Sequence, residues 1–406
     1  MSAAGTVAHR GRWQPEDRAA EHYRYLPVEV PDGAAGLRVQ LSYDRSAGVL
    51  DLGCFAAGDK FRGWSGGARD RYAIGPDWAT PGYLAGALPA GEWHVALGLH
   101  RVPPGGIAWE VRAEVCAVVA KPSAPAPPVP QRPPRRTGLP APDGLRWLAG
   151  DLHAHTLHSD GVLTVEQLAA LAAAAGLDFL AVTDHNTTSH HRELAAAGAR
   201  YGLTLLPGQE VTTGLGHANA FGDIGWVDFR RPAADWVSTV DARGGLLSVN
   251  HPLGGDCAWR QPLPHRPPLA EVWHSGWWDR TWGAPLAWLL GWDPATIPVG
   301  GSDFHDPSHA EALGRPTTWV AAKDASVPAI LDGLRAGRVA ISESPDGPLL
   351  LRAGTELIAL GADGLLLTGF HGRRRVIRGE RRVLPAQDGV HWLEDGATRV
   401  MALAGW

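Results

Sequence analysis

The stretch Asp151-Leu-His-Ala-His-Thr-Leu-His-Ser-Asp-Gly161 decides the fold, because it ends an apolar segment and places two histidines at alternate positions. Alternate residues of a β-strand share one face, so His153 and His155 can bind one metal ion. Asp160 follows five residues later, where the chain turns toward an Ala-rich helix that begins near Thr164. We therefore expect one strand end to supply three metal ligands.

From residue 145 the chain alternates short apolar segments with helical ones, a pattern typical of parallel strands joined by helices. Thr164-Val-Glu-Gln167 has the form of a capping box and predicts the start of the first helix, while Gly176 predicts its end. Polar residues follow the later apolar segments in the same way. Because the catalytic groups of a parallel barrel lie at the carboxyl ends of its strands, we expect these polar residues to meet in one site.

Nine residues at these segment ends form the candidate ligand set. Any one of them could be structural in a chain with 18 histidines, but their joint order indicates a metal centre. Imidazole and carboxylate ligands without thiolates suit Zn, Mn or Fe rather than a closed structural zinc site. Nine ligands are too many for one ion, so we expect two or three divalent ions. The set comprises His153, His155, Asp160, His185, Glu210, His217, His251, Asp303 and His305.

We place the metal-binding part of the chain at residues 145–344. Two regions precede it and one follows it. Residues 1–120 contain alternating, β-rich segments separated by Gly and Pro, and predict a β-sandwich accessory domain. Residues 121–144 predict a proline-rich linker or an extended strap, because proline lacks an N–H and fixes φ. Residues 345–406 show short β-like segments without helical periodicity and predict a small β-rich domain. The fold class is therefore α/β with β-rich flanks.

Composition restricts the function classes. A formal net charge of −5 argues against a binding surface for duplex nucleic acid, which needs a basic face. The chain shows no apolar segment of 18 residues and no signal peptide, so we expect a cytoplasmic protein without a membrane partner. Cys54, Cys116 and Cys257 lie far apart, which indicates reduced thiols rather than a disulfide scaffold.

Residues 151 to 344 resemble the polymerase and histidinol phosphatase (PHP) superfamily of metal-dependent phosphoesterases. The two β-like flanks look most similar to the branch that contains the carbaryl-hydrolase-like (CehA/McbA) metallohydrolases, and the first 120 residues resemble jelly-roll accessory domains. The motifs that carry the resemblance are Asp151-Leu-His-Ala-His-Thr, Ser159-Asp-Gly, Val182-Thr-Asp-His-Asn, Gly208-Gln-Glu, His217, Asn250-His-Pro and Gly300-Gly-Ser-Asp-Phe-His.

The resemblance implies a distorted (βα)7 PHP barrel with a trinuclear metal centre. It also suggests that Asp184 and Asn250 orient the imidazoles, although each could equally satisfy the backbone of a loop. It assigns the ions, in order, to His153, His155, Glu210 and Asp303; to Glu210, His217 and His251; and to Asp160, His185 and His305.

These residues predict a metal-dependent hydrolase, foremost a phosphoesterase acting on a small metabolite, a nucleotide or a short oligonucleotide. Two ions about 3.5–4 Å apart can share a hydroxide and direct it at phosphorus or at a carbonyl carbon, so no protein nucleophile is required. The sequence leaves the general acid open among His274, His190 and His191. Arginines that could meet a phosphate are Arg260, Arg266, Arg280 and Arg315.

Two alternatives remain open. The same metal centre could hydrolyse a carboxylic ester or carbamate, such as an aryl ester, because tryptophans crowd residues 259–292 and could form an aromatic wall. Trp288 and Trp292 suit a core helix, whereas Trp277, Trp278 and Trp282 are candidates for a lid. The other alternative is a non-catalytic ligand-binding module that the metals only stabilise.

Overall fold

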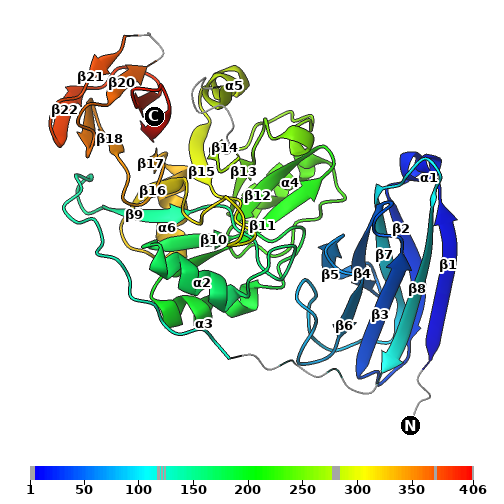
Figure 1. Cartoon of the computed structure of the whole chain (residues 1–406). Coiled ribbons are helices and arrows are strands. Elements are labelled where there is room, and N and C mark those ends of the chain that lie inside the picture. The colour runs from blue at the N-terminus through cyan, green and yellow to red at the C-terminus, as the bar shows by residue number, and fades with distance from the viewer. Residues whose placement is uncertain are drawn as a thin grey trace. The chain divides into compact units, whose positions relative to one another are not determined.

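Figure 1 shows the computed structural model of the chain, which describes residues 5–116, 119, 122, 125–276, 284–369 and 373–404. The chain separates into two compact units. The first contains Met1–Pro125 and two short loops, Leu157–Asp160 and His185–His190. The second contains Ala126–Thr156, Gly161–Asp184 and His191–Trp406. None of the helices in the described ranges is both long and apolar enough to span a membrane.

The first unit contains two four-stranded antiparallel sheets, with strand orders β1-β8-β3-β6 and β2-β7-β4-β5. Inward-facing side chains from both sheets form one apolar core. Trp64 and Trp93 are buried, so both indoles pack in the interior. The elements are β1 (Thr6–Trp13), α1 (Pro15–Ala20), β2 (Tyr23–Val30), β3 (Gly36–Tyr43), β4 (Val49–Ala56), β5 (Lys60–Gly66), β6 (Arg71–Ile74), β7 (Gly91–Arg101) and β8 (Ile107–Cys116).

The second unit is built on a large mixed sheet. Strands β9, β10 and β11 run parallel, as do β13, β14 and β15, while β12 is antiparallel to both its neighbours. The first elements are β9 (Arg146–Asp151), α2 (Val165–Ala174), β10 (Phe179–Val182), α3 (His191–Tyr201), β11 (Thr204–Thr213), β12 (Gly216–Phe221), α4 (Ala233–Ala242) and β13 (Leu246–Val249). A short 3-10 turn (Gly255–Cys257), β14 (Leu269–His274), α5 (Ala284–Trp292), β15 (Ile297–Gly301), β16 (Thr317–Ala322), α6 (Val327–Arg335) and β17 (Val339–Ser342) follow.

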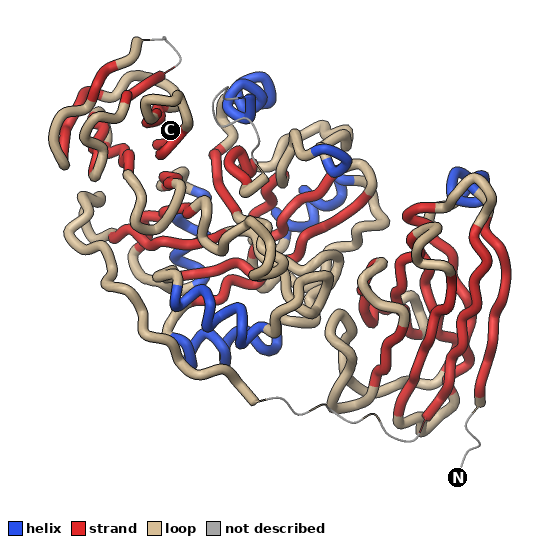
Figure 2. The backbone as a smooth tube through the Cα atoms, in the orientation of Figure 1, coloured by secondary structure: helices blue, strands red, loops and turns tan. Residues whose placement is uncertain are grey.

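The C-terminal strands continue this sheet. Strand β24 pairs with β17, so the sheet has 13 strands in the order β15-β14-β13-β12-β11-β10-β9-β16-β17-β24-β23-β20-β21. Strands β18, β19 and β22 form a separate three-stranded sheet. Figure 2 shows strands throughout the chain and helices mainly in the second unit. The elements are β18 (Leu349–Ala353), β19 (Glu356–Leu360), β20 (Leu366–Gly369), β21 (Arg375–Val376), β22 (Arg381–Pro385), β23 (His391–Glu394) and β24 (Val400–Ala404).

The fold is mixed α/β, but the described residues form no closed (βα)7 barrel. Strand β16 pairs with β9 on one side and with β17 on the other, both antiparallel. Strand β15 pairs with β14 and is the last strand in the order of the sheet. Beyond β15, Phe304 forms one isolated parallel bridge with Ala154 after β9, and the described residues contain no ladder that closes the sheet there.

Helix α2 follows the predicted capping box. The Thr164 side chain accepts a hydrogen bond from the Gln167 backbone N–H (3.1 Å), and the Gln167 side chain accepts one from the Thr164 N–H (2.9 Å). Gly176, just after the helix, has a φ of 83°, a conformation that glycine adopts without a steric penalty. The start and end predicted for this helix are thus confirmed.

The described proline-rich residues from 126 to 142 form an extended strap on the second unit. The Tyr201 hydroxyl donates to the Pro127 carbonyl oxygen (2.8 Å), and the Trp147 indole N–H donates to that of Pro140 (2.8 Å). Arg132 donates to the carbonyl oxygen of Gly202 (2.9 Å). These hydrogen bonds hold the strap on the second unit. The strap itself forms no helix or strand, as its proline content requires.

Candidate metal centre

Two of the predicted motifs lie side by side at the ends of β9 and β15. Ala154 and Phe304 form a parallel bridge, and the His155 N–H donates to the Phe304 carbonyl oxygen (2.9 Å). Both bridging side chains are buried in an apolar cluster. Since side chains alternate along a strand, the flanking residues point to the opposite face. This register brings together His153, His155, Asp303 and His305.

Glu210 and His217 come from the hairpin formed by β11 and β12. Glu210 lies opposite Asn219, and His217 lies opposite Thr212, two positions further along. The side-chain period of two therefore places Glu210 and His217 on the same face of the hairpin. His251 follows β13, the next strand of the sheet.

The buried carboxylate of Glu210 is the hub of what we call the Glu210 cluster, formed by Glu210, His153, His155, His217, His251 and Asp303. Its Oε1 lies 3.2 Å from His217 Nδ1, 3.2 Å from His251 Nε2 and 3.3 Å from His153 Nε2. Its Oε2 lies 3.5 Å from His155 Nε2. One carboxylate thus approaches four imidazoles, and such a cluster could bind metal.

The atoms of the Glu210 cluster suit a metal ion. Asp303 Oδ1 lies 3.1 Å from His153 Nε2 and 2.9 Å from His155 Nε2. His153 Nε2 is fully buried, yet within the described chain it has no partner with hydrogen-bonding geometry, although two carboxylates lie close to it. A buried nitrogen in such surroundings costs free energy unless a proton or a metal ion binds its lone pair. Together, His153, His155, Glu210 and Asp303 could hold an ion.

Two residues outside the predicted set orient the imidazoles of this cluster. His153 Nδ1–H donates to Glu271 Oε1 (3.0 Å), and the His251 backbone N–H donates to Glu271 Oε2 (2.9 Å). The Cys257 thiol donates to the Gly254 carbonyl oxygen (2.9 Å), so its sulfur can accept the Nδ1–H of His251 (3.3 Å). Both contacts leave the Nε2 lone pair for a metal.

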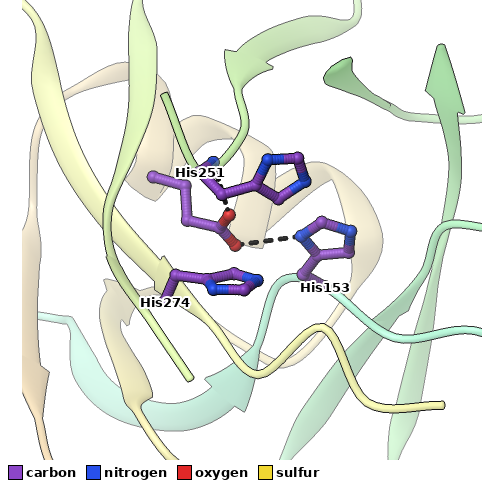
Figure 3. Close-up of side chains that lie close together, drawn as sticks. His153, His251 and His274 are labelled. Atoms are coloured by element: carbon purple, nitrogen blue, oxygen red, sulfur yellow. Dashed lines mark hydrogen bonds and ion pairs between the residues drawn. The ribbon is translucent and has the colours of Figure 1, made fainter. Parts of the chain in front are cut away.

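Figure 3 shows His153, His251 and His274 close together, and the carboxylate of Glu271 accepts hydrogen bonds from the first two. Glu271 lies within β14, away from the strand ends that the sequence motifs mark, and is buried. Gly301 permits the close approach, because a Cβ there would lie 2.4 Å from Glu271 Oε1 and 2.5 Å from His153 Cβ. No metal-ligand spacing in the sequence points to Glu271, and only the neighbouring strand order brings it to the site.

Strained backbone coincides with the candidate ligands. His251 and Asp303 have φ values of 25° and 52°, and Asn186, which follows His185, has a φ of 56°. Non-glycine residues in this region cost about 1–3 kcal/mol each and persist where the surrounding structure enforces them. Asp151 contributes to this enforcement, because its buried carboxylate accepts backbone N–H groups of His153 (3.1 Å), Ser302 (3.0 Å) and Gly314 (2.8 Å).

The remaining candidate ligands form two pairs. Within the first unit, Asp160 Oδ2 lies 3.6 Å from His185 Nε2. Within the second unit, the ring of His305 stacks on that of His155 with centroids 4.2 Å apart. His305 Nδ1–H donates to the Asp303 carbonyl oxygen (2.7 Å), so Nε2 is the nitrogen of His305 that could bind an ion.

The two residues predicted to orient imidazoles, Asn250 and Asp184, make different hydrogen bonds. Asn250 Nδ2 donates to Glu210 Oε1 (2.8 Å), so it orients a carboxylate ligand rather than an imidazole. Asp184 accepts the backbone N–H (2.8 Å) and the hydroxyl (2.7 Å) of Thr156, and so satisfies the loop after His155. For Asp184, the loop-backbone alternative is the one that the structure supports.

Among the three candidate acids, His274 contacts a predicted ligand, since its Nε2 lies 3.1 Å from Asp303 Oδ2. His190 is fully buried, and His191 Nε2 donates to the Gly208 carbonyl oxygen (2.9 Å). His274 Nδ1 accepts the Gly276 N–H (2.9 Å), which places the proton of a neutral imidazole on Nε2. His274 therefore donates a hydrogen bond toward the cluster, and with His153, His251 and Glu271 it also belongs to a group that could hold a metal ion.

The aromatic and arginine candidates are mostly structural. The rings of Trp288 and Trp292 stack, and with Trp259 and Trp273 they pack on one apolar cluster, as expected for core residues. Arg260 donates to the Gly214 carbonyl oxygen (2.7 Å), and Arg266 lies over the Trp292 ring (4.3 Å). The lid candidates Trp277, Trp278 and Trp282, with Arg280, lie outside the described residues.

We expect Cys257→Ala to weaken metal binding, because it removes the acceptor of the His251 Nδ1–H. Outer-shell partners of metal-binding histidines contribute about 10- to 100-fold to metal affinity. Cys257→Ser retains a hydroxyl that can accept this hydrogen and should lose less. Titration calorimetry with Zn²⁺ measures both variants, and equal affinities for wild type, Ala and Ser would refute a role for the sulfur.

The stability of the metal-free protein should depend on pH, and metal binding should show the opposite dependence. Burial lowers the pKa of His153, but the carboxylates of Asp303, Glu271 and Glu210 outweigh it and raise that pKa well above the ordinary value. Protonated His153 thus stabilises the metal-free fold fully below about pH 6.5, and this stability is lost as pH rises through the folded-state pKa.

A metal ion needs the deprotonated ring, so the gain in Tm on adding Zn²⁺ should grow between pH 6 and pH 9. Thermal unfolding of the chelated and the Zn²⁺-loaded protein, measured in parallel buffers, tests this. A gain that stays constant or shrinks over the range would contradict it.

Comparison with known proteins found a family model and several relatives that match part of the chain. Residues 151–234 match the model of the PHP domain. The 3',5'-nucleoside bisphosphate phosphatase of Chromobacterium violaceum is 46% identical over 66 residues, which are 16% of this chain and 23% of the relative. The 5'-3' exoribonuclease Rnm of Escherichia coli is 42% identical over 67 residues, or 16% and 22% of the two chains.

The matched segment thus spans less than a quarter of each of these curated relatives. Among solved structures, a two-domain protein from Bacteroides vulgatus, described as containing a predicted PHP-like metal-dependent phosphoesterase, aligns with a TM-score of 0.45 and 19% identity. That alignment covers 68% of this chain and 99% of the other. On the strength of the match to residues 151–234, the chain contains a PHP domain.

Proposed function

We propose that this protein is a metal-dependent phosphoesterase whose ions bind at the Glu210 cluster. The observation that carries the proposal is the buried Glu210 carboxylate, which lies within 3.5 Å of four imidazoles. A buried carboxylate surrounded by oriented imidazoles is the ligand chemistry of Zn, Mn and Fe sites. When bound, such ions would activate water and neutralise charge on the phosphoryl oxygens.

The assignment of residues to ions is part of the proposal and follows the resemblance. The Glu210 cluster would hold two ions, with Glu210 shared between them. The Asp160 and His185 pair would serve a third ion together with His305. The mixed sheet described above would correspond to the distorted seven-stranded barrel of the PHP superfamily.

The chain's own residues suggest how a substrate is held. A cavity of about 220 Å³ is lined by His274 and Arg315, with Glu311 and Glu343 also at its wall. We assign Arg315 to the negative charge of the ester, and the Nε2–H of His274 to the hydrogen bond that orients Asp303. The carboxylates Glu311 and Glu343 could accept hydroxyl groups of a ribose or a similar polyol.

The substrate class that we propose is a phosphomonoester or phosphodiester of a nucleotide, a small metabolite or a short oligonucleotide. The relatives include a nucleoside bisphosphate phosphatase and exoribonucleases. Because some relatives are exoribonucleases, the exclusion of duplex nucleic acid drawn from net charge has no support, and RNA belongs among the test substrates.

A carbamate or carboxylic ester remains the alternative suggested by the resemblance to the CehA/McbA branch. The tryptophans that the described residues show in this region pack in the core, so they do not add to that case. A panel of adenosine 3',5'-bisphosphate, bis-p-nitrophenyl phosphate, a 5'-phosphorylated RNA oligonucleotide, p-nitrophenyl acetate and an aryl carbamate separates the substrates.

We expect phosphate release that requires Mn²⁺, Zn²⁺ or Fe²⁺ and that Asp303→Asn abolishes, with the ester and carbamate inert. Turnover of the carbamate or ester with inert phosphates would reverse the choice of substrate. A protein that binds metal but hydrolyses none of these compounds would instead support the non-catalytic module.

A further inference from the structure

The two loops that carry Asp160 and His185 are anchored within the first unit by residues of its β-strand region. Arg69, which follows β5, donates a hydrogen bond from its guanidinium to the carbonyl oxygen of Leu157. Gly82, in the segment between β6 and β7, contacts the loops at both of its backbone groups. These anchors are more than 70 residues away from the loops in sequence, so no local motif marks them.

The contacts at Gly82 form a connected network of hydrogen bonds, in which the Gly82 N–H also lies 3.4 Å from His158 Nδ1 and the Thr187 hydroxyl 3.1 Å from Ser189 Oγ. The Gly82 N–H donates to Ser189 Oγ (3.1 Å), whose own hydroxyl donates to His158 Nδ1 (2.7 Å). The Ser189 N–H donates to Thr187 Oγ1 (3.2 Å), whose hydroxyl donates to the Gly82 carbonyl oxygen (2.9 Å). His158, Thr187 and Ser189 are each less than 5% exposed, so water does not compete effectively for these bonds.

Gly82 has no room for a side chain. Its φ is 98°, and a Cβ would lie 2.9 Å from the carbonyl oxygens of both His158 and Trp64. Both of these are backbone atoms, so any substitution must move either the loop or strand β5. The Trp64 N–H also donates to the Gly82 carbonyl oxygen (3.0 Å), which ties this turn to the strand.

The anchored residues lie at the same separation in sequence from the two candidate ligands. His158 precedes Asp160 by two residues, and Thr187 follows His185 by two. Asp160 and His185 themselves are partly exposed and rely on their loops for position. Buried hydrogen bonds so close to both ligands fix their backbone, which is what orients a metal-binding pair.

We propose that the β-strand region of the first unit is a positioning component for the candidate ligands Asp160 and His185 of the same unit, acting through Gly82 and the Thr187–Ser189–His158 bonds. This inference rests on the proposed function in one respect, namely that Asp160 and His185 bind an ion. Gly82, Thr187 and Ser189 are positioning residues.

The test measures metal content and affinity in the full-length protein after reconstitution with Mn²⁺ or Zn²⁺. Gly82→Ala, Ser189→Ala and Thr187→Val each break the set of bonds, whereas Thr187→Ser keeps the hydroxyl. Gly33→Ala is the matched control, because Gly33 also has a positive φ (74°) but a Cβ there meets nothing within 4 Å. Asp160→Asn reports on the ligand itself.

We expect the affinity for the most weakly held equivalent of metal to fall about 10- to 100-fold in Gly82→Ala, Ser189→Ala and Thr187→Val. Thr187→Ser and Gly33→Ala should bind metal as the wild type does. If Ser189→Ala and Thr187→Val retain wild-type metal affinity while Asp160→Asn loses it, the positioning role is refuted and the proposed function stands. If Asp160→Asn also retains it, the proposed ligand assignment fails, and the positioning role fails with it.

Discussion

Glu210→Gln should lose the metal centre and the hydrolytic activity together. The substitution keeps the shape of the side chain but removes the charge that His153, His155, His217 and His251 face. A neutral amide is a poor ligand for Zn or Mn and cannot bridge two ions. We expect kcat/KM for a phosphate ester to fall by more than about 100-fold, the upper end of the loss for an outer-shell partner.

Metal analysis of the purified variant and a phosphate-release assay measure this effect. Glu394→Gln is the matched control, because Glu394 is also a buried carboxylate of the second unit. Its carboxylate accepts a hydrogen bond from the Trp392 indole (2.7 Å) and forms an ion pair with Arg374 (3.1 Å). That control should keep its metal and its activity. A Glu210→Gln protein with wild-type metal content would show that the ions bind elsewhere.

Glu271→Gln should lower metal affinity about 10- to 100-fold, although Glu271 is not itself among the proposed ligands. Its carboxylate accepts the His153 Nδ1–H and the His251 backbone N–H, so it sets the orientation of two imidazoles. Burial raises the pKa of Glu271, but the charge on His153 and other histidines outweighs it and lowers that pKa below the ordinary value. The residue is therefore a carboxylate at neutral pH and increases the basicity of His153.

The distinctive outcome for this variant is recovery at high metal concentration. Because the ligands themselves remain, excess Zn²⁺ or Mn²⁺ should restore most of the activity of Glu271→Gln but little of that of Glu210→Gln. Activity measured as a function of metal concentration separates the two variants. If excess metal restores neither or both to the same degree, Glu271 does not act through orientation of His153.

Much of the Glu210 cluster could be predicted from the sequence because alternation along strands is a local property. His153 and His155 share a face, Asp303 and His305 share a face, and the Ala154–Phe304 bridge places the two pairs together. Seven of the nine predicted residues meet in the second unit, and the other two meet in the first. The capping box of α2 was equally predictable, since it depends on residues three positions apart.

The remaining features depend on contacts between distant segments. Glu271 reaches the site only because β14 lies between β13 and β15, and nothing in its local sequence indicates a partner for His153. The antiparallel pairing of β16 with β9 could not be predicted either, because the two strands lie far apart in the sequence. Gly82 belongs to a β-rich segment without metal-binding residues, and its contacts with the Asp160 and His185 loops are visible only in three dimensions.

The most direct test of the account is to remove the metal from the wild-type protein and restore it while phosphate release is measured. Chelation followed by dialysis should leave a folded protein with negligible activity on adenosine 3',5'-bisphosphate or on a 5'-phosphorylated oligonucleotide. Stepwise addition of Mn²⁺ or Zn²⁺ should restore activity, with saturation at two to three equivalents per chain. A metal-free protein that hydrolyses these esters at the rate of the loaded one would contradict the account.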